Sequence, residues 1–165
     1  MRSIRNKLHT IIFTCVLAFV LSVGIYSYLV AYTMQGNHPT ERMTAYVTRV
    51  IDGDTFDAEL EDGSKLVVRL IGVDAPESVN GDASLNTEEG RAASEYTKRR
   101  LEGKSVELEY DREQKDRYGR KLCYVYVDGE MFNIRLLKDG HAELMIIRPN
   151  VRYERALRKA AGGRK

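Results

Sequence analysis

The sequence predicts an α+β fold, namely a closed five-stranded β-barrel with about three helices, behind an N-terminal transmembrane helix. Three observations support this. Five β-rich segments are separated by turn signals, one long helical pattern falls between the third and fourth of them, and a charge-free apolar run comes near the start of the chain. Three strands, one helix and two more strands is an order typical of a small Greek-key barrel.

The N-terminal segment differs from the rest of the chain. Three basic residues among the first seven precede residues 8–40, which contain no Asp, Glu, Lys or Arg. The apolar part exceeds the roughly 7–15 residues of a cleaved signal and matches the roughly 20 that cross a bilayer. Because the positive charges come first, we expect a cytoplasmic N-terminus and an exported remainder. We therefore predict an uncleaved membrane anchor, with secretion after cleavage as the alternative.

The chain thus divides into five expected parts. They are a basic cytoplasmic segment at 1–9, a transmembrane signal-anchor at 10–33, a linker at 34–42, the folded domain at 43–161 and a basic tail at 162–165. Four of the 26 basic residues and one of the 24 acidic residues precede Met43, so 43–165 carries 22 basic and 23 acidic residues. A general nucleic-acid coat would be basic throughout. This domain therefore needs local positive charge or a metal ion to hold a polyanion.

The expected strands show apolar and β-branched alternation between turn signals. They are residues 43–51, 55–60, 65–71, 104–110 and 121–127. The second and third flank Glu61-Asp62-Gly63-Ser64 and therefore predict a hairpin. Alternate apolar residues of the third share one face, so Arg69 points to the other face. Cys123 lies within the apolar pattern of the last strand, where a buried small hydrophobe is expected.

Residues 88–101 predict a helix, because Asn86 or Thr87 can cap it, acids begin it and three basic residues end it. The other expected elements are a helix at 131–139, a short extended segment at 143–147 and a helix at 151–161. A basic stripe runs along the last helix and the segment before it, formed by Arg148, Arg152, Arg155 and Lys159. Its role stays open between a solvated helix face and a face for phosphates or lipids.

Three short segments combine acids and arginines. They are Ile51-Asp52-Gly53-Asp54-Thr55, the segment Val68 to Glu77, and Asp116-Arg117-Tyr118-Gly119-Arg120. Carboxylates in tight loops can bind a hard cation, and arginine grips phosphate oxygens with a fork that lysine lacks. Glu77, three residues after Asp74, could take a proton from water. Taken singly, Arg69 could instead be an exposed arginine paired with Glu59, but the set together indicates a site for phosphodiester hydrolysis.

In these segments the chain resembles the staphylococcal (micrococcal) nuclease, or thermonuclease, family, from Tyr46 to about Arg158. The resemblance implies an OB-fold barrel and a calcium-dependent endonuclease that hydrolyses DNA outside the cytoplasm, with RNA as an open alternative. It implies calcium ligands at Asp54, Asp74 and the backbone carbonyl of Ala75, with Asp52 helping through water. It implies catalytic roles for Arg69, Glu77 and Arg120, and substrate-binding roles for Arg117 and Tyr118.

The chain also departs from that family. Met145-Ile146-Ile147 replaces an aromatic pair, which leaves Tyr118 as the expected platform for base stacking, and Ala75 replaces a threonine. A noncatalytic OB-fold module that binds nucleic acid or protein at the membrane is the alternative function. The expected partners are DNA or RNA, single strands above all, and the membrane. No protein partner is implied, and a monomer is expected.

Overall fold

The computed structural model describes residues 16–28, 42–78 and 87–163. The chain separates into two compact units, Met1–Thr40 and Glu41–Lys165. In the first, residues 16–28 form a helix with exposed side chains. Among the described residues, no helix is both long and apolar enough to cross a membrane. The predicted cytoplasmic segment, both ends of the predicted anchor and nearly all of the predicted linker lie outside these residues, so the anchor stays a prediction.

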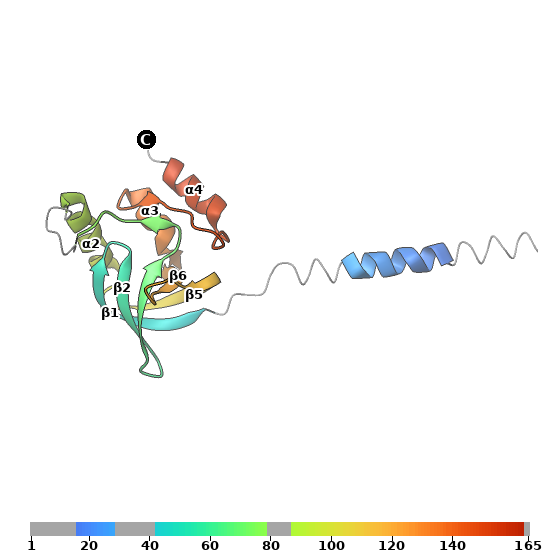
Figure 1. Ribbon diagram of the computed structural model, residues 1–165, viewed down its shortest axis with the longest axis horizontal. Coiled ribbons are helices and arrows are strands. Elements are labelled where there is room, and N and C mark those ends of the chain that lie inside the picture. The colour runs from blue at the N-terminus through green and yellow to red at the C-terminus, as the bar shows by residue number, and fades with distance from the viewer. Residues whose placement is uncertain (1–15, 29–41, 79–86, 164–165) are drawn as a thin grey trace, which may run out of the picture. The chain divides into compact units, whose positions relative to one another are not determined.

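The second unit is a barrel whose strands follow the order β3-β2-β1-β5-β6-β7, closed by pairing of β3 with β6 (Figure 1). Its main strands are β1 Met43–Asp52, β2 Thr55–Leu60, β3 Lys65–Leu70, β5 Ser105–Lys115 and β6 Lys121–Val127. A short β7, Glu130–Met131, extends the sheet beyond β6, and β4, Val73–Asp74, pairs separately with β8, Glu143–Leu144. The predicted five-stranded barrel is confirmed. The fourth main strand is longer than the predicted 104–110.

The barrel closes through a parallel pairing, whereas its other strand pairs are antiparallel. Arg69 of β3 lies opposite Leu122 of β6, and Leu70 lies opposite Cys123. A chain segment of about fifty residues, including α2, separates these two strands. The seam between β3 and β6 therefore joins parts of the sequence that no local signal connects.

The β2–β3 hairpin forms where the sequence predicts it. Gly63 adopts a φ of 81°, which a side chain would strain, and the Asp62 carboxylate accepts a hydrogen bond from the Ser64 backbone N–H at 2.9 Å. Asp57 then lies opposite Val67 in the antiparallel ladder. The turn thereby sets the register that places Arg69 on β3.

Three helices accompany the barrel: α2 Glu88–Leu101, α3 Phe132–Asp139 and α4 Glu154–Gly162. Figure 1 shows α3 and α4 over one end of the barrel and α2 at its side. The Thr87 hydroxyl accepts the Gly90 N–H at 2.9 Å, so the predicted cap and the predicted 88–101 helix are correct. The last helix begins three residues later than predicted, and just before it the Arg152 N–H donates to Asp111 of β5 at 3.0 Å.

Cys123 lies at the closing seam and is completely buried, as its apolar setting predicts. Burial raises the pKa of its thiol to about 12. At neutral pH the side chain therefore stays protonated and packs as a small hydrophobe.

We expect native Cys123 to resist a thiol-specific disulfide reagent at pH 8, because attack requires an accessible thiolate. The measurement uses the full chain with Cys15→Ser, which leaves one thiol, and compares labelling with and without denaturant. Labelling should be fast in denaturant and limited by opening of the barrel without it. Equal rates in both conditions would show that the seam does not protect the thiol.

Candidate active site

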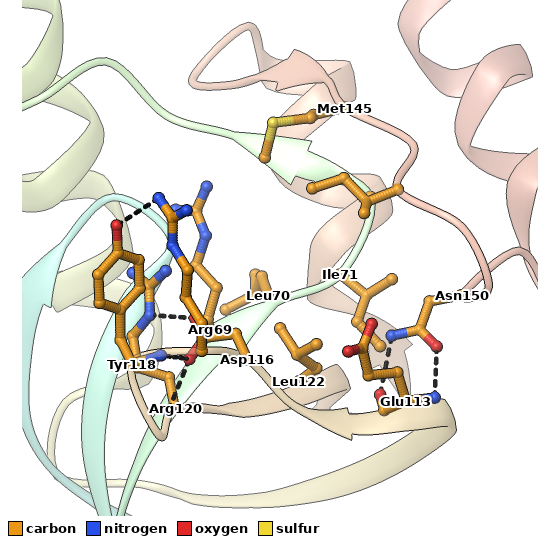
Figure 2. Close-up of a pocket in the computed structure, with 13 residues that line it drawn as sticks. Arg69, Leu70, Ile71, Glu113, Asp116, Tyr118, Arg120, Leu122, Met145 and Asn150 are labelled. Atoms are coloured by element: carbon orange, nitrogen blue, oxygen red, sulfur yellow. Dashed lines mark hydrogen bonds and ion pairs between the residues drawn. The ribbon is translucent and has the colours of Figure 1, made fainter.

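The β3–β6 seam positions two arginines at one pocket. Arg69 is on β3, and Arg120 directly precedes β6. They line a pocket of about 440 Å³, within the range of small-ligand sites. Figure 2 shows the arginines and Tyr118 at one end of it and Asn150 at the other. The lining is completed by Leu70, Ile71, Gly72, Glu113, Asp116, Arg117, Leu122, Met145 and Ile147.

Arg69 holds together the two carboxylates that the sequence predicts as calcium ligands. Its guanidinium is in direct ionic contact with Asp54 and donates to Asp74 Oδ1 at 2.7 Å. The contact with Asp54 is buried, whereas Asp74 is half-exposed. Arg69 is therefore not an exposed strand arginine paired with Glu59. Its side chain is largely buried and pairs with Asp54 and Asp74.

Asp54 is the most enclosed acid of the site, with 0% of its side chain exposed. Its Oδ2 accepts the Ala75 N–H at 2.7 Å, and its Oδ1 accepts the Thr55 hydroxyl at 3.1 Å. A buried carboxylate needs such partners, because ionised groups are costly to desolvate. These bonds tie the turn after β1 to the loop after β4.

This arrangement suits a hard cation. One guanidinium touches both Asp54 and Asp74, so the two carboxylates are close enough to share a single positive charge. Oxygen donors are the ligands that calcium prefers. Across the described ranges, no three Asp, Glu, His or Cys side chains converge on one point. A calcium ion here would therefore take its remaining ligands from backbone oxygens and water.

The turn before β6 holds Arg120 in place. Arg120 Nε donates to Asp116 Oδ2 at 2.7 Å, while Asp116 Oδ1 accepts the backbone N–H groups of Tyr118 and Arg120, each at 2.9 Å. Burial alone would raise the pKa of Asp116, but the hydrogen bonds and charge of Arg120 outweigh it, so the pKa lies below its usual value. Asp116 thus stays ionised and orients Arg120.

Tyr118 is an exposed ring with cations around it. The Arg117 guanidinium lies 4.7 Å from the ring centroid and donates to the tyrosine hydroxyl at 2.6 Å, while the Arg120 guanidinium lies 5.4 Å from the centroid. Figure 2 shows this ring at one end of the pocket, beside Arg69. Guanidinium groups and an exposed aromatic face in one place suit a phosphate with its attached base.

Glu77 lies on a loop that packs against the start of α2. Its side chain is exposed, and its backbone carbonyl accepts the Thr87 N–H at 3.1 Å. The next residue, Ser78, bonds Ser94 of α2 at 2.5 Å and donates to Asp52 at 3.4 Å. The loop that carries Glu77 is therefore positioned by α2, not by the barrel strands alone.

Gly90 makes this packing testable, because a Cβ there would overlap the Glu77 backbone carbonyl. Alanine normally favours a helix interior by about 1 kcal/mol over glycine. For the phosphodiester hydrolysis that the motifs predict, we nevertheless expect Gly90→Ala to lower kcat by about 10²-fold, since a 1 Å displacement of Glu77 can cost that much. Arg91→Ala, exposed and one residue on, is the matched control and should leave kcat unchanged. An unchanged rate in Gly90→Ala would show that packing against α2 does not position Glu77 for catalysis.

The structure brings together four of the eight predicted site residues around one pocket: Arg69, Arg117, Tyr118 and Arg120. Three more connect to them through Arg69, which binds Asp54 and Asp74, while Asp54 in turn binds the backbone of Ala75. Glu77 follows two residues later and is not among the described residues that line the pocket. The roles given to these eight residues remain predictions.

Sequence reasoning missed several pocket residues. Asp116 was part of a noted motif, and its position three residues before Gly119 is a type I turn signal that could have assigned its role. Glu113 and Asn150 had no such signal, because they meet only through the tertiary fold. Gly72 approaches Leu157 of α4 so closely that a Cβ would overlap it, which locates α4 beside the pocket.

Comparison with known proteins identifies the family of the chain. The profile of the family described as "Staphylococcal nuclease homologue" matches residues 67–163. The chain is 40% identical over 141 residues to a "Thermonuclease" of Staphylococcus hyicus, covering 86% of this chain and 82% of that protein. It is 40% identical over 152 residues to a "Thermonuclease" of Staphylococcus intermedius, with 88% and 86% coverage. It is 34% identical over 125 residues to "Endonuclease YncB" of Bacillus subtilis, with 74% and 58% coverage.

The family match covers more than half of the chain, and the two thermonucleases align over most of their own length. The matched region contains the seam, the pocket and α2 to α4. On these grounds the chain belongs to the staphylococcal nuclease family.

Proposed function

We propose that this protein is a calcium-dependent endonuclease that hydrolyses DNA outside the cytoplasm. Its family membership makes it a nuclease, an enzyme that hydrolyses phosphodiester bonds. The observation that carries the proposal is the meeting of the Arg69 and Arg120 guanidiniums with Tyr118 at one pocket. Such a site binds a phosphate group and an adjoining base together.

The two arginines have distinct anchors and one shared task. Arg69 is held by Asp54 and Asp74, and Arg120 by Asp116. Their forks bind the phosphate oxygens and stabilise the charge that builds on them in the transition state. Because Asp116 is fixed by backbone hydrogen bonds, Arg120 needs little reorganisation when the phosphate arrives. Arg69 shares its two acids with the proposed calcium ion and would release part of that contact when the ion binds.

Asp54, Asp74 and the backbone carbonyl of Ala75 would hold the calcium ion. When bound, calcium polarises a phosphoryl oxygen and supplies Lewis-acid chemistry. Glu77 takes a proton from the attacking water, and its exposed carboxylate is free to face the solvent that supplies that water. Arg117 binds a neighbouring phosphate, and Tyr118 stacks on a base.

The substrate and the location are proposed on sequence grounds. A charge-free apolar run after three basic residues supports a membrane anchor with the nuclease domain outside the cytoplasm. A domain with nearly balanced charge has few phosphate contacts, which favours single strands and modest salt dependence. DNA is the proposed substrate, with RNA as an alternative, and the protein is proposed to act as a monomer.

The test assays the full chain on denatured DNA, first with calcium and then with a chelator. Glu77→Gln is compared with Glu61→Gln, an exposed acid of the β2–β3 turn. We expect cleavage that needs calcium, is lost in Glu77→Gln and persists in Glu61→Gln. Calcium should also raise the melting temperature. Stabilisation by calcium without cleavage would indicate a binding module. Cleavage at the same rate in the presence of the chelator would show that the enzyme does not depend on calcium.

A further inference from the structure

An interruption in the β5–β6 ladder directs one acid into the pocket. The strands pair from Glu107 to Tyr110, and pairing resumes only at Lys115, which lies opposite Lys121. Residues 111–114 therefore leave the regular ladder. Such bulges bend a strand and redirect its side chains. Glu113, inside this interruption, lines the pocket.

Asn150 anchors the interrupted segment. Its Oδ1 accepts the Glu113 backbone N–H, and its Nδ2 donates to the Glu113 backbone carbonyl, each at 2.8 Å. Asn150 is only 4% exposed. Its side chain thus replaces the missing β6 partner, since buried backbone groups need hydrogen bonds. This clamp fixes the backbone from which the Glu113 side chain extends.

The Glu113 carboxylate gives the pocket two unlike ends. In Figure 2 it projects between Leu122 and Asn150, at the end away from Tyr118 and Arg120. Figure 2 shows the aliphatic side chains of Ile71 and Leu122 beside it, whereas Met145 lies at a distance from it. The other acid of the pocket, Asp116, is occupied by Arg120. Among the described contacts of the pocket, Glu113 bonds through its backbone, so its carboxylate is available to a ligand.

A phosphodiester joins two nucleosides, so when one base stacks on Tyr118 the nucleoside on the other side of the bound phosphate would extend its base toward this second end. An ionised carboxylate only accepts hydrogen bonds. Cytosine offers its N4 amino group, adenine its N6 amino group, and guanine an N–H and an amino group side by side. Thymine and uracil offer one ring N–H between two carbonyl oxygens, which repel a carboxylate. Rejection of the wrong partner contributes to specificity as much as attraction of the right one.

We infer that Glu113 is a specificity-determining residue that selects, in this pocket, a base bearing an amino group over thymine or uracil. The inference rests on the proposed nuclease function, since it assigns the base specificity of the same site. Asn150 is the positioning residue that fixes the backbone of Glu113. The phosphate end, by contrast, treats all nucleotides alike.

Direct binding tests this without catalysis. The four deoxynucleoside 3′,5′-bisphosphates are titrated by calorimetry into the full chain, Glu113→Gln and Glu107→Gln, an exposed acid of the same strand. We expect the wild type to bind the amino-bearing bases about tenfold more tightly than thymine, as a good base contact allows. Glu113→Gln should lose most of that ratio, because an amide also donates. Loss of the negative charge would strengthen the binding of all four bisphosphates equally. Only a changed ratio between the affinities for the amino-bearing bases and for thymine therefore supports the inference.

Cleavage separates this inference from the nuclease proposal. Wild type and Glu113→Gln digest denatured DNA of random sequence, and the new ends are sequenced. A bias at one position beside the cut, absent in the variant at similar total activity, supports the role of Glu113. If wild type and Glu113→Gln gave identical end profiles, or equal ratios of affinity for the bisphosphates, the role of Glu113 would be overturned, although the protein would still be a nuclease. If the wild type does not cleave, the proposed function fails, and the calorimetric ratios alone decide about Glu113.

Discussion

Replacing Arg69 with alanine should lower kcat on denatured DNA by about 10²–10³-fold, as loss of one charge-stabilising donor does at comparable sites. The same change removes the cation that Asp54 and Asp74 share. Their mutual repulsion then favours any ion that replaces it. We therefore expect the variant to bind calcium at least as tightly as the wild type, measured by calorimetry, although it cleaves far more slowly.

Two further variants make this result specific. Arg69→Lys keeps the charge but lacks the planar fork that grips a phosphate, so most of the rate should still be lost. Arg49→Ala removes an exposed arginine paired with Asp57 and should leave both rate and calcium binding unchanged. Weakened calcium binding in a folded Arg69→Ala protein would show that the guanidinium supports the cation site, contrary to this expectation.

Replacing Glu109 with alanine should lower the free energy of unfolding by about 3 kcal/mol, the lower end of the cost of breaking a buried ion pair. Only 1% of its side chain is exposed. It accepts Arg152 at 2.8 Å and the Tyr153 hydroxyl at 2.9 Å, and Arg42 lies 3.3 Å away. Both arginines are partly exposed and can reach water once the acid is lost, which keeps the cost near that lower end.

Glu107→Ala is the matched control for urea unfolding. Glu107 is on the same strand and pairs with the same Arg42 at 2.9 Å, but 52% of its side chain is exposed. Surface pairs of this kind contribute about 0–1 kcal/mol. Burial should therefore decide the difference between the two variants. Equal losses would mean that Glu109 contributes no more than a surface ion pair.

Residues with local signals were predictable from the sequence. Helix α2 carries its cap at Thr87 and its charged ends within its own segment, so its limits match the prediction. The β2–β3 hairpin likewise depends on four consecutive residues around Gly63. The arginines and acids of the site could be named because they lie in compact motifs. The helix cap and the hairpin turn are formed by hydrogen bonds between residues close together in the sequence.

Features that depend on distant partners were not predictable. Strand β5 runs five residues past its predicted end, and its interrupted part is completed by Asn150, 37 residues after Glu113. The segment just before α4 is likewise held by Asp111, which accepts the Arg152 N–H from 41 residues away. A pairing of Arg69 with Glu59 stayed open when the residue was considered alone, because Asp54 and Asp74 reach it only after the turn and loop fold over β3.

The parallel seam between β3 and β6 has a consequence for the newly made chain. Arg69 and Arg120 come together only when these strands join, after about fifty intervening residues have been synthesised. Contacts so far apart in sequence are slow to form. The two arginines are therefore apart in a nascent or still unfolded polypeptide. We expect the chain to have no nuclease activity until the barrel is complete.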